Sequence, residues 1–309
     1  MDYHRRLIED SVRVESFLDA LDRVVTSETI VYDIGAGLGI LGLYAAKIGA
    51  KRVYLVESNR IIEVAREVAR YNHLKNVEFI QGDARYVEVP EKGDVAVCEG
   101  IGNFFVTDEM QSVYRAIPRF LKDGGRIIPS RITLYVAPAF VLTFPGVRFW
   151  EETVIRGLSF KPVAGFALNR AYIVDVPRGF LIAEPQIYKE ISVPDVPDEL
   201  DGTMHFVVSK TGMRLTGFIG WFSADLTPGV RLSTSPGIRT HWGQMLFPVR
   251  EIPLQRGDEI ELRLTLTIDE TYRNVFRWRG RVIRGGVELL SFDHNSERRY
   301  AKQASKEDY

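Results

Sequence analysis

Apolar residues recur along the chain with two different periods, and the change between them falls near residue 130. Before it, short apolar runs rich in β-branched residues alternate with stretches that have the helical period, a pattern typical of buried strands and amphipathic helices. Strands are predicted at 29–35, 52–58, 77–83 and 94–99, and helices at 5–25, 38–50, 60–74 and 108–125. This alternation predicts a parallel, doubly wound sheet with right-handed crossovers.

Beyond residue 130 the helical period largely disappears. The segments 204–226, 259–270 and 274–285 alternate apolar with polar residues, which predicts strands of an antiparallel sheet or barrel. A strand is also predicted at 126–138, leaving the first fold for the second. The stretch 148–176 is irregular and rich in aromatic residues, and the polar tail is expected to fray.

The predicted fold class is therefore α/β followed by β. An N-terminal helix is assigned to residues 1–28, a doubly wound, Rossmann-like domain to 29–132, and an antiparallel β-barrel domain to 133–309. The helix at 108–125 is expected to end at Gly124-Gly125, because glycine is common just after helices.

Composition and charge restrict the classes of partner. The 309 residues carry a formal net charge of −1, which removes any global electrostatic case for direct nucleic-acid binding or for an anionic membrane. No apolar run approaches the ~18 residues of a membrane span, and the polar start is unlike a signal peptide. The single cysteine, Cys98, excludes an intrachain disulfide and fits a reducing compartment. We expect a cytoplasmic protein with no membrane partner.

A glycine-rich turn follows the first predicted strand. Gly35, Gly37 and Gly39 form G-x-G-x-G, whereas a dinucleotide site prefers G-x-G-x-x-G. Asp33 precedes the turn and suits an ammonium group better than a pyrophosphate, which it would repel. Glu57 ends the second strand, about twenty residues further on, the interval at which an acid can reach ribose hydroxyls.

Together these features resemble the class I S-adenosylmethionine-dependent methyltransferases, and the resemblance implies S-adenosylmethionine as cofactor. It places Asp33 at the methionine end, Glu57 on the ribose and Asp83 at the adenine edge. Taken alone, Asp83 suits the cap of a turn equally well. The N-terminal helix would lie over the cofactor.

Acidic residues stand at both ends of a glycine-bearing loop, CEGIGNFFVTDEM at 98–110. Glu99 directly follows a buried apolar run, where a carboxylate is costly without a cationic partner. Doubly wound folds bind ligands at this edge of the sheet, and paired carboxylates suit a guanidinium. Because guanidinium has a pKa above ~12 and is a poor nucleophile, catalysis would come mainly from positioning and electrostatics.

This loop resembles the double-glutamate loop of the protein arginine methyltransferases, and the resemblance extends over most of the chain. It implies that Glu99 is the first catalytic acid, that Asp108 is the second, and that Met110 lies beside the target-arginine pocket. Taken alone, Asp108 is more simply an N-cap for the helix that follows.

Other segments resemble the same family. LIEDSVR matches its first helix, which implies that Arg13 binds the cofactor carboxylate. Thr240-His241-Trp242 matches a loop that the family's barrel projects over the active site, and in the family the acid at Asp10 pairs with the histidine at His241. The 148–176 stretch resembles its dimerisation arm, which implies a head-to-tail homodimer.

The resemblance implies methyl transfer to a guanidino nitrogen of arginine in a protein or peptide. Departures from the family pattern keep alternatives open. Gly100, Ile101 and Asn103 replace the family's tryptophan, methionine and tyrosine, and Leu7 replaces a methionine. We also expect the family's tyrosine-rich cofactor-covering helix to be missing, and Glu109 could replace Asp108 if the loop shifted register. The alternatives are another acceptor (a free guanidino compound, an amine or a hydroxyl) and an inactive cofactor-binding scaffold.

Overall fold

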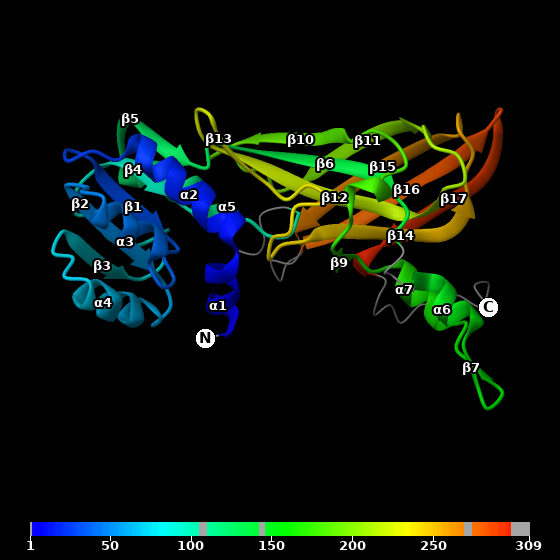
Figure 1. Cartoon of the computed structure of the whole chain (residues 1–309), viewed down its shortest axis with the longest axis horizontal. Coiled ribbons are helices and arrows are strands. Elements are labelled where there is room, and N and C mark those ends of the chain that lie inside the picture. The colour runs from blue at the N-terminus through cyan, green and yellow to red at the C-terminus, as the bar shows by residue number, and fades with distance from the viewer. Residues whose placement is uncertain (1, 105–109, 142–145, 269–273, 298–309) are drawn as a thin grey trace.

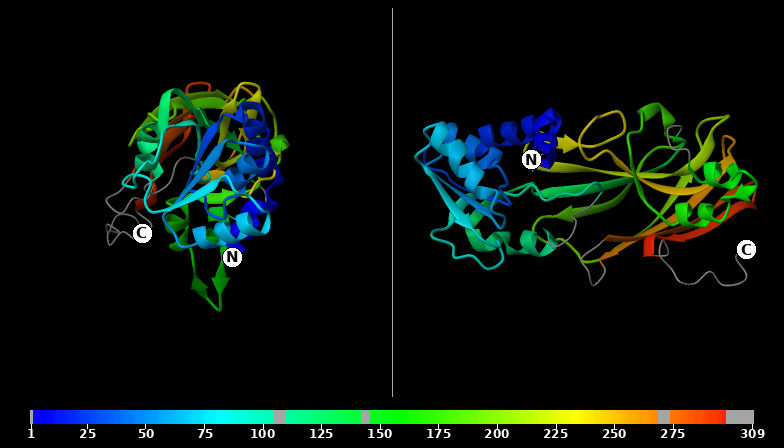
Figure 2. Two further views of the ribbon diagram at one scale, coloured as in Figure 1. Left: turned by 90° about the vertical axis from the view of Figure 1, so that its left-hand side faces the viewer. Right: turned by 90° about the horizontal axis from the view of Figure 1, so that it is seen from below.

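A computed structural model describes the chain apart from residues 1, 105–109, 142–145, 269–273 and 298–309. Figure 1 shows an elongated molecule, with helices around a parallel sheet at one end and antiparallel strands at the other. A helical pair and a short hairpin project from the antiparallel end, and Figure 2 shows the same arrangement from the side and from below. Within the described residues, no helix is long and apolar enough to cross a membrane.

The parallel sheet confirms the predicted doubly wound arrangement. Its strands pair in the order β3-β2-β1-β4-β5, and each neighbouring pair is parallel. Their bounds are Ile30–Ile34 (β1), Arg52–Glu57 (β2), Val77–Gln81 (β3), Gly93–Val97 (β4) and Leu121–Ile128 (β5). The chain leaves β1 toward β2 on one side and adds β4 on the other, so a crevice forms at the carboxyl ends of β1 and β4.

The predicted N-terminal helix at 5–25 is wrong as one element, because the structure divides it in two. Helix α1 spans Asp2–Glu9 and α2 spans Ser11–Val24. Between them the Asp10 backbone leaves the helical region, and its Oδ1 accepts a hydrogen bond from the Arg13 backbone N–H at 3.0 Å. Aspartate favours this N-cap position over a helix interior because its side chain satisfies an otherwise unpaired donor.

The two helices predicted between strands are confirmed. They are α3, Ile40–Lys47, and α4, Ile62–Tyr71. Helix α3 packs against β1, β2 and α2, and most of its side chains are buried, as expected for a helix between a sheet and another helix.

The predicted helix at 108–125 is much shorter in the structure. Helix α5 spans Met110–Ala116, a 3-10 turn covers Ile117–Phe120, and Gly124-Gly125 lie inside β5. Pro118 accounts for the early end, since proline has no N–H and clashes with the preceding helical turn. The single strand predicted at 126–138 is likewise divided, because β5 ends at Ile128 and β6 runs over Arg131–Ala139.

The second half confirms the predicted antiparallel strands, which form more than one hydrogen-bonded sheet. One sheet has the order β10-β6-β12-β14-β9 with β13 on β12, and another has the order β11-β15-β16-β17. Aromatic side chains such as Phe247 and Trp278 meet between them in a common core. The bounds are Gln186–Ser192 (β10), Leu200–Val207 (β11), Arg214–Thr227 (β12), Val230–Ser233 (β13), Gln244–Pro253 (β14), Glu259–Ile268 (β15), Asn274–Arg284 (β16) and Val287–Asn295 (β17).

The irregular stretch at 148–176 forms the projection in Figure 1. Its elements are α6 (Gly146–Glu152), which begins two residues before the stretch, the hairpin β7 (Val154–Ile155) and β8 (Leu158–Ser159), α7 (Val163–Leu168) and β9 (Tyr172–Val174). We call this segment the arm. Helices α6 and α7 bury a small apolar cluster of their own, and β9 returns the chain to the sheet beside β14.

Candidate active site

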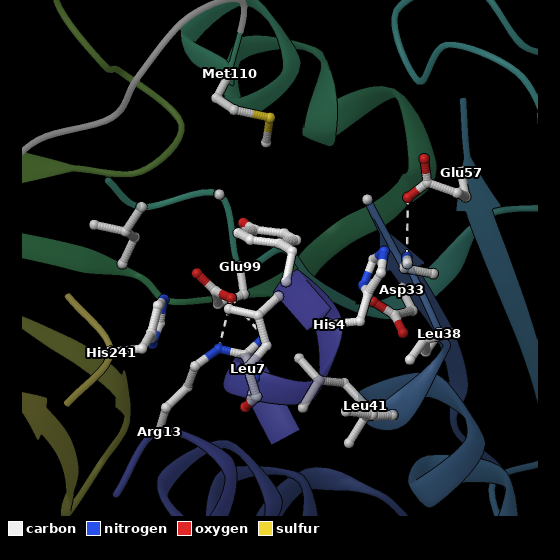
Figure 3. A pocket seen from close by; sticks show the side chains of 17 residues that line it. His4, Leu7, Arg13, Asp33, Leu38, Leu41, Glu57, Glu99, Met110 and His241 are labelled. Atoms are coloured by element: carbon white, nitrogen blue, oxygen red, sulfur yellow. Dashed lines mark hydrogen bonds and ion pairs between the residues drawn. The ribbon is translucent and has the colours of Figure 1, made fainter. Parts of the chain in front are cut away.

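A cavity of about 340 Å³ opens in the crevice at the carboxyl ends of β1 and β4. Its walls come from α1, α2, the glycine-rich turn, the loop after β4 and the loop before β14 (Figure 3). Most residues predicted from the sequence for cofactor, acceptor or catalysis line it: Arg13, Asp33, Gly35, Gly37, Glu57, Glu99, Met110 and His241.

The glycine-rich turn lines this cavity, and its Gly35 and Gly37 N–H groups are bonded within the chain, to the Val56 carbonyl and to the Glu57 carboxylate. Gly35, Gly37 and Gly39 all have positive φ, between 55° and 80°, a region that non-glycine residues rarely adopt. Gly39 does not line the cavity. A Cβ atom there would lie 2.6 Å from Leu55 Cδ2, so its glycine is required for packing α3 against the sheet.

Glu57 closes one end of the cavity from the end of β2. Its Oε2 accepts a hydrogen bond from the Gly37 N–H at 2.9 Å, and its Oε1 accepts one from the Asn59 N–H at 2.7 Å. The Ser58 hydroxyl also donates to Oε1 at 3.5 Å, so these bonds fix the carboxylate and leave Oε2 able to accept another hydrogen bond. Asp83 is placed differently, because its carboxylate pairs with Arg85 and does not line the cavity.

Asp33 is buried at the bottom of the glycine-rich turn, where its Oδ2 accepts a hydrogen bond from the Gly42 N–H at 2.8 Å. Burial raises the pKa of this carboxyl to about 7, against the opposing effects of the Gly42 hydrogen bond and the Arg13 charge. Asp33 is therefore poised between its neutral and ionised forms near neutral pH, and a cation in the cavity would favour the anion.

The partner that Glu99 requires is Arg13. The Arg13 Nε lies 2.7 Å and a terminal nitrogen 2.5 Å from Glu99 Oε2, and Arg13 also donates to the Leu7 carbonyl at 3.1 Å. The side chains of Arg13 and Glu99 are 8% and 10% exposed. Burial raises the pKa of Glu99, and the nearby Arg13 charge counteracts this rise. The sequence assigned these residues to the cofactor and the acceptor separately, whereas the structure joins them in a buried ion pair.

His241 pairs with Asp10, the residue whose other carboxylate oxygen accepts the Arg13 backbone N–H. The His241 Nδ1 is 2.7 Å from Asp10 Oδ2, which also accepts the His241 backbone N–H at 2.8 Å. Burial lowers the pKa of His241, and the hydrogen bond to Asp10 opposes this effect. The imidazole is therefore neutral near pH 7. When Nδ1 donates its hydrogen to Asp10 Oδ2, Nε2 remains a proton acceptor.

Trp242 does not line the cavity but joins two loops behind it. Its indole N–H donates to the Ile101 carbonyl at 2.8 Å, and the Asn103 side-chain amide donates to the Trp242 carbonyl. The ring is buried and packs edge-on against Phe222. These contacts tie the loop that carries Glu99 to the antiparallel half.

The described residues include only part of the far end of the acidic loop. Asp108 and Glu109 lie outside the described residues, so the choice between them stays a prediction from sequence. Met110 begins α5 and lines the cavity. A Cβ atom at Gly100 would lie 2.1 Å from Met110 Cε, so the thioether occupies the space that a side chain at position 100 would need.

Sequence reasoning missed the lining residues of α1. Tyr3, His4 and Leu7 reach the cavity from this helix, and the His4 ring lies near Gly37 (Figure 3). Tyr3 and Leu7 are four residues apart and therefore share a helix face, a signal that was available in the sequence. Part of the cavity wall thus comes from α1, which lies within the N-terminal residues 1–28 that we expected over the cofactor.

Comparison with known proteins identifies the family. Residues 31–125 match the model of a methyltransferase domain, and residues 130–276 match that of the arginine methyltransferase oligomerization subdomain. Protein arginine N-methyltransferase 6 of Xenopus tropicalis is 31% identical over 284 residues, covering 85% of this chain and 83% of the relative. The chain belongs to the protein arginine N-methyltransferase family. Protein arginine N-methyltransferase PRMT10 of Arabidopsis thaliana is 29% identical over 307 residues, covering 86% of this chain and 80% of that relative.

Solved structures of arginine methyltransferases agree with the fold. Arabidopsis thaliana protein arginine methyltransferase 10 superposes with a TM-score of 0.82 at 27% identity, covering 96% of this chain and 97% of that one. The Trypanosoma brucei PRMT1 enzyme-prozyme heterotetrameric complex with AdoHcy gives a TM-score of 0.86 at 19% identity, covering 95% and 96%. The predicted succession of a doubly wound half and an antiparallel half is confirmed over nearly the whole length.

Proposed function

We propose that this arginine methyltransferase family member transfers a methyl group from S-adenosylmethionine to a guanidino nitrogen of arginine in proteins. The observation that carries the proposal is the Arg13–Glu99 contact. Glu99, buried in the cavity wall, already binds one guanidinium in this structure, that of the chain itself. A substrate arginine carries the same planar group, with donors that fit the same carboxylate.

The polar residues that line the cavity fit S-adenosylmethionine. Asp33 and Arg13 offer opposite charges to an ammonium and a carboxylate, Glu57 Oε2 can accept a ribose hydroxyl, and the cavity has the volume of a small-molecule site. These residues would hold the cofactor, with Gly35 and Gly37 allowing its close approach. When bound, it supplies a methyl group on a sulfonium whose thioether is the leaving group. The assigned roles of Asp83 and Trp242 lack this support, because neither side chain reaches the cavity.

Glu99 would orient the substrate guanidinium and draw its positive charge toward the nitrogens that do not react. As the nitrogen–carbon bond forms and the carbon–sulfur bond breaks, the methylated nitrogen must lose one proton. The neutral His241, with Nδ1 held by Asp10, offers Nε2 as the acceptor for that proton. Asp108, as the second acid, would complete the guanidinium site, and Met110 would bound it.

A different acceptor is the strongest alternative within the same chemistry. Asn103, which stands where the family has tyrosine, donates a hydrogen bond to the Trp242 carbonyl. The Met110 side chain occupies the space that a side chain at Gly100 would fill. The surroundings of Glu99 therefore differ from the family pattern on the acceptor side. An inactive cofactor-binding scaffold would keep the same cavity without turnover.

Methyl transfer to defined acceptors distinguishes these functions. The full chain is incubated with methyl-labelled S-adenosylmethionine and an arginine-glycine-rich peptide, the same peptide with lysine for arginine, or free arginine. We expect label in the arginine peptide alone. Label only in free arginine would reassign the substrate to small guanidino compounds, and donor binding without transfer to any acceptor would establish a scaffold.

We also infer that the chain forms a head-to-tail homodimer through the arm. Its residues 130–276 match an oligomerization subdomain. The arm exposes apolar side chains at its tip, and helix α4 exposes others on the outside of the sheet domain, as two surfaces that could meet in a dimer. The exposed members are Phe149, Val154, Ile155, Leu158 and Phe166 on the arm and Val64, Val68 and Tyr71 on α4.

Sedimentation at micromolar concentration should show a dimer, and Leu158→Asp should convert it to a monomer because a charge would be buried in the contact. Leu158 is 69% exposed in the single chain, so its replacement should not disturb the fold. Ile187→Asp, at a site 54% exposed outside the arm, is the matched control and should remain dimeric. A purely monomeric wild-type protein would contradict the inference.

A further inference from the structure

Tyr114 lies behind Glu99 and outside the cavity. It belongs to α5, four residues after Met110, so the two side chains leave the same face of the helix. Met110 lies against Gly100 from the cavity side, whereas the Tyr114 ring is fully buried in the core. Helix α5 therefore contacts the residues on either side of Glu99 through two side chains, Met110 and Tyr114.

The Tyr114 hydroxyl bonds the peptide groups on both sides of Glu99. It donates a hydrogen bond to the Cys98 carbonyl at 3.1 Å and accepts one from the Gly100 N–H at 3.2 Å. Burial raises the pKa of Tyr114 well above its usual value, so the hydroxyl keeps its proton and can act as donor and acceptor together.

These hydrogen bonds replace the strand pairing that ends after Cys98. The Cys98 N–H still donates to the Ile128 carbonyl at 2.9 Å, in continuation of the β4–β5 pairing. Beyond it the chain turns away to form the acidic loop, and buried backbone groups there need other partners. Tyr114 supplies partners for the groups that flank Glu99.

We propose that Tyr114 is a positioning residue for the methyl-transfer reaction. It fixes the backbone of Glu99 and thereby the position of the Glu99 carboxylate relative to the acceptor guanidinium. The proposal rests on the proposed function, since it requires Glu99 to hold the substrate guanidinium. A displacement of about 1 Å at a reacting group can reduce the rate by as much as 10²-fold. The hydroxyl acts through Glu99 and need not touch substrate or cofactor.

Tyr114→Phe removes the hydroxyl and keeps the buried ring, so the variant should fold. We expect kcat with the arginine peptide to fall tenfold to hundredfold, the affinity for S-adenosylhomocysteine to change less than twofold, and amide exchange at Gly100 to accelerate at least tenfold. Tyr32→Phe is the matched control. Tyr32 is equally buried, and its hydroxyl donates to the Glu91 carbonyl at 2.6 Å, away from the cavity.

The control should lose stability and retain kcat and Gly100 protection. Assays are run below the unfolding midpoint of each variant, measured by thermal unfolding. A Tyr114→Phe enzyme with wild-type kcat would overturn the proposal, as would an equal loss of kcat in Tyr32→Phe. If the wild type transfers no methyl group, the proposed function fails on its own, and Gly100 exchange decides the inference. Unchanged exchange in Tyr114→Phe would refute it, and accelerated exchange would establish the hold on Glu99.

Discussion

Replacing Glu99 with glutamine is expected to lower kcat for methyl transfer to an arginine peptide by about 10²–10³-fold, which corresponds to roughly 3–4 kcal/mol of activation free energy. Glutamine keeps the volume and one acceptor oxygen but loses the negative charge. In the proposed reaction that charge would face the substrate guanidinium while the nitrogen attacks, and the Glu99 side chain is only 10% exposed, where electrostatic interactions are strong.

The affinity for the methyl donor should separate this effect from a general disruption. In the structure Glu99 holds Arg13, the residue assigned to the donor carboxylate. The Glu99 carboxylate competes with the donor carboxylate for Arg13. The Glu99→Gln variant lacks this competitor and should bind the donor as tightly as the wild type or more tightly. Glu91→Gln is the matched control, because Glu91 accepts hydrogen bonds from Tyr54 and Arg52 and lies outside the cavity. A Glu99→Gln enzyme within threefold of wild-type kcat would rule out the assigned role.

Replacing Arg13 with alanine is expected to reduce the free energy of unfolding by about 3–5 kcal/mol at pH 8, because it leaves a buried carboxylate without its cation. Donor affinity should fall about tenfold to hundredfold with the loss of a charge-assisted hydrogen bond. The effect on stability should depend on pH. Removal of Arg13 raises the pKa of Glu99 further above its ordinary value of 4.5, so the folded protein binds more protons than the unfolded chain above that pH.

The sign of this dependence can be measured by denaturant unfolding between pH 4 and pH 8. The stability deficit of Arg13→Ala should be smallest near pH 4, where Glu99 is protonated in both states, and should grow as pH rises. The double variant Arg13→Ala/Glu99→Gln should recover much of the deficit at pH 8, because no buried charge remains. A deficit that is equal at both ends of the range and is unrelieved in the double variant would contradict the ion-pair account.

Local patterns were sufficient to predict the order and type of most elements. The strands that became β1, β2 and β4 were predicted because their apolar runs are short and nearly continuous, and the strands of the second half because polar residues alternate with apolar ones. The errors fall where one residue overrides a periodic pattern. Asp10 starts a new helix within an amphipathic run, and Pro118 ends α5 before the glycines that seemed to mark its end.

The doubly wound order, the glycine-rich turn and the set of polar residues available to the cavity could be predicted from the amino-acid sequence, because each follows from spacing between near neighbours in the chain. Which of these residues bind one another could be read only from the folded chain. Arg13 meets Glu99 across 86 positions, and Trp242 meets Ile101 across 141. Such pairs depend on how packed helices and sheets bring distant segments together. A buried carboxylate such as Glu99 needs a cation beside it, and the packing of α2 places Arg13 there.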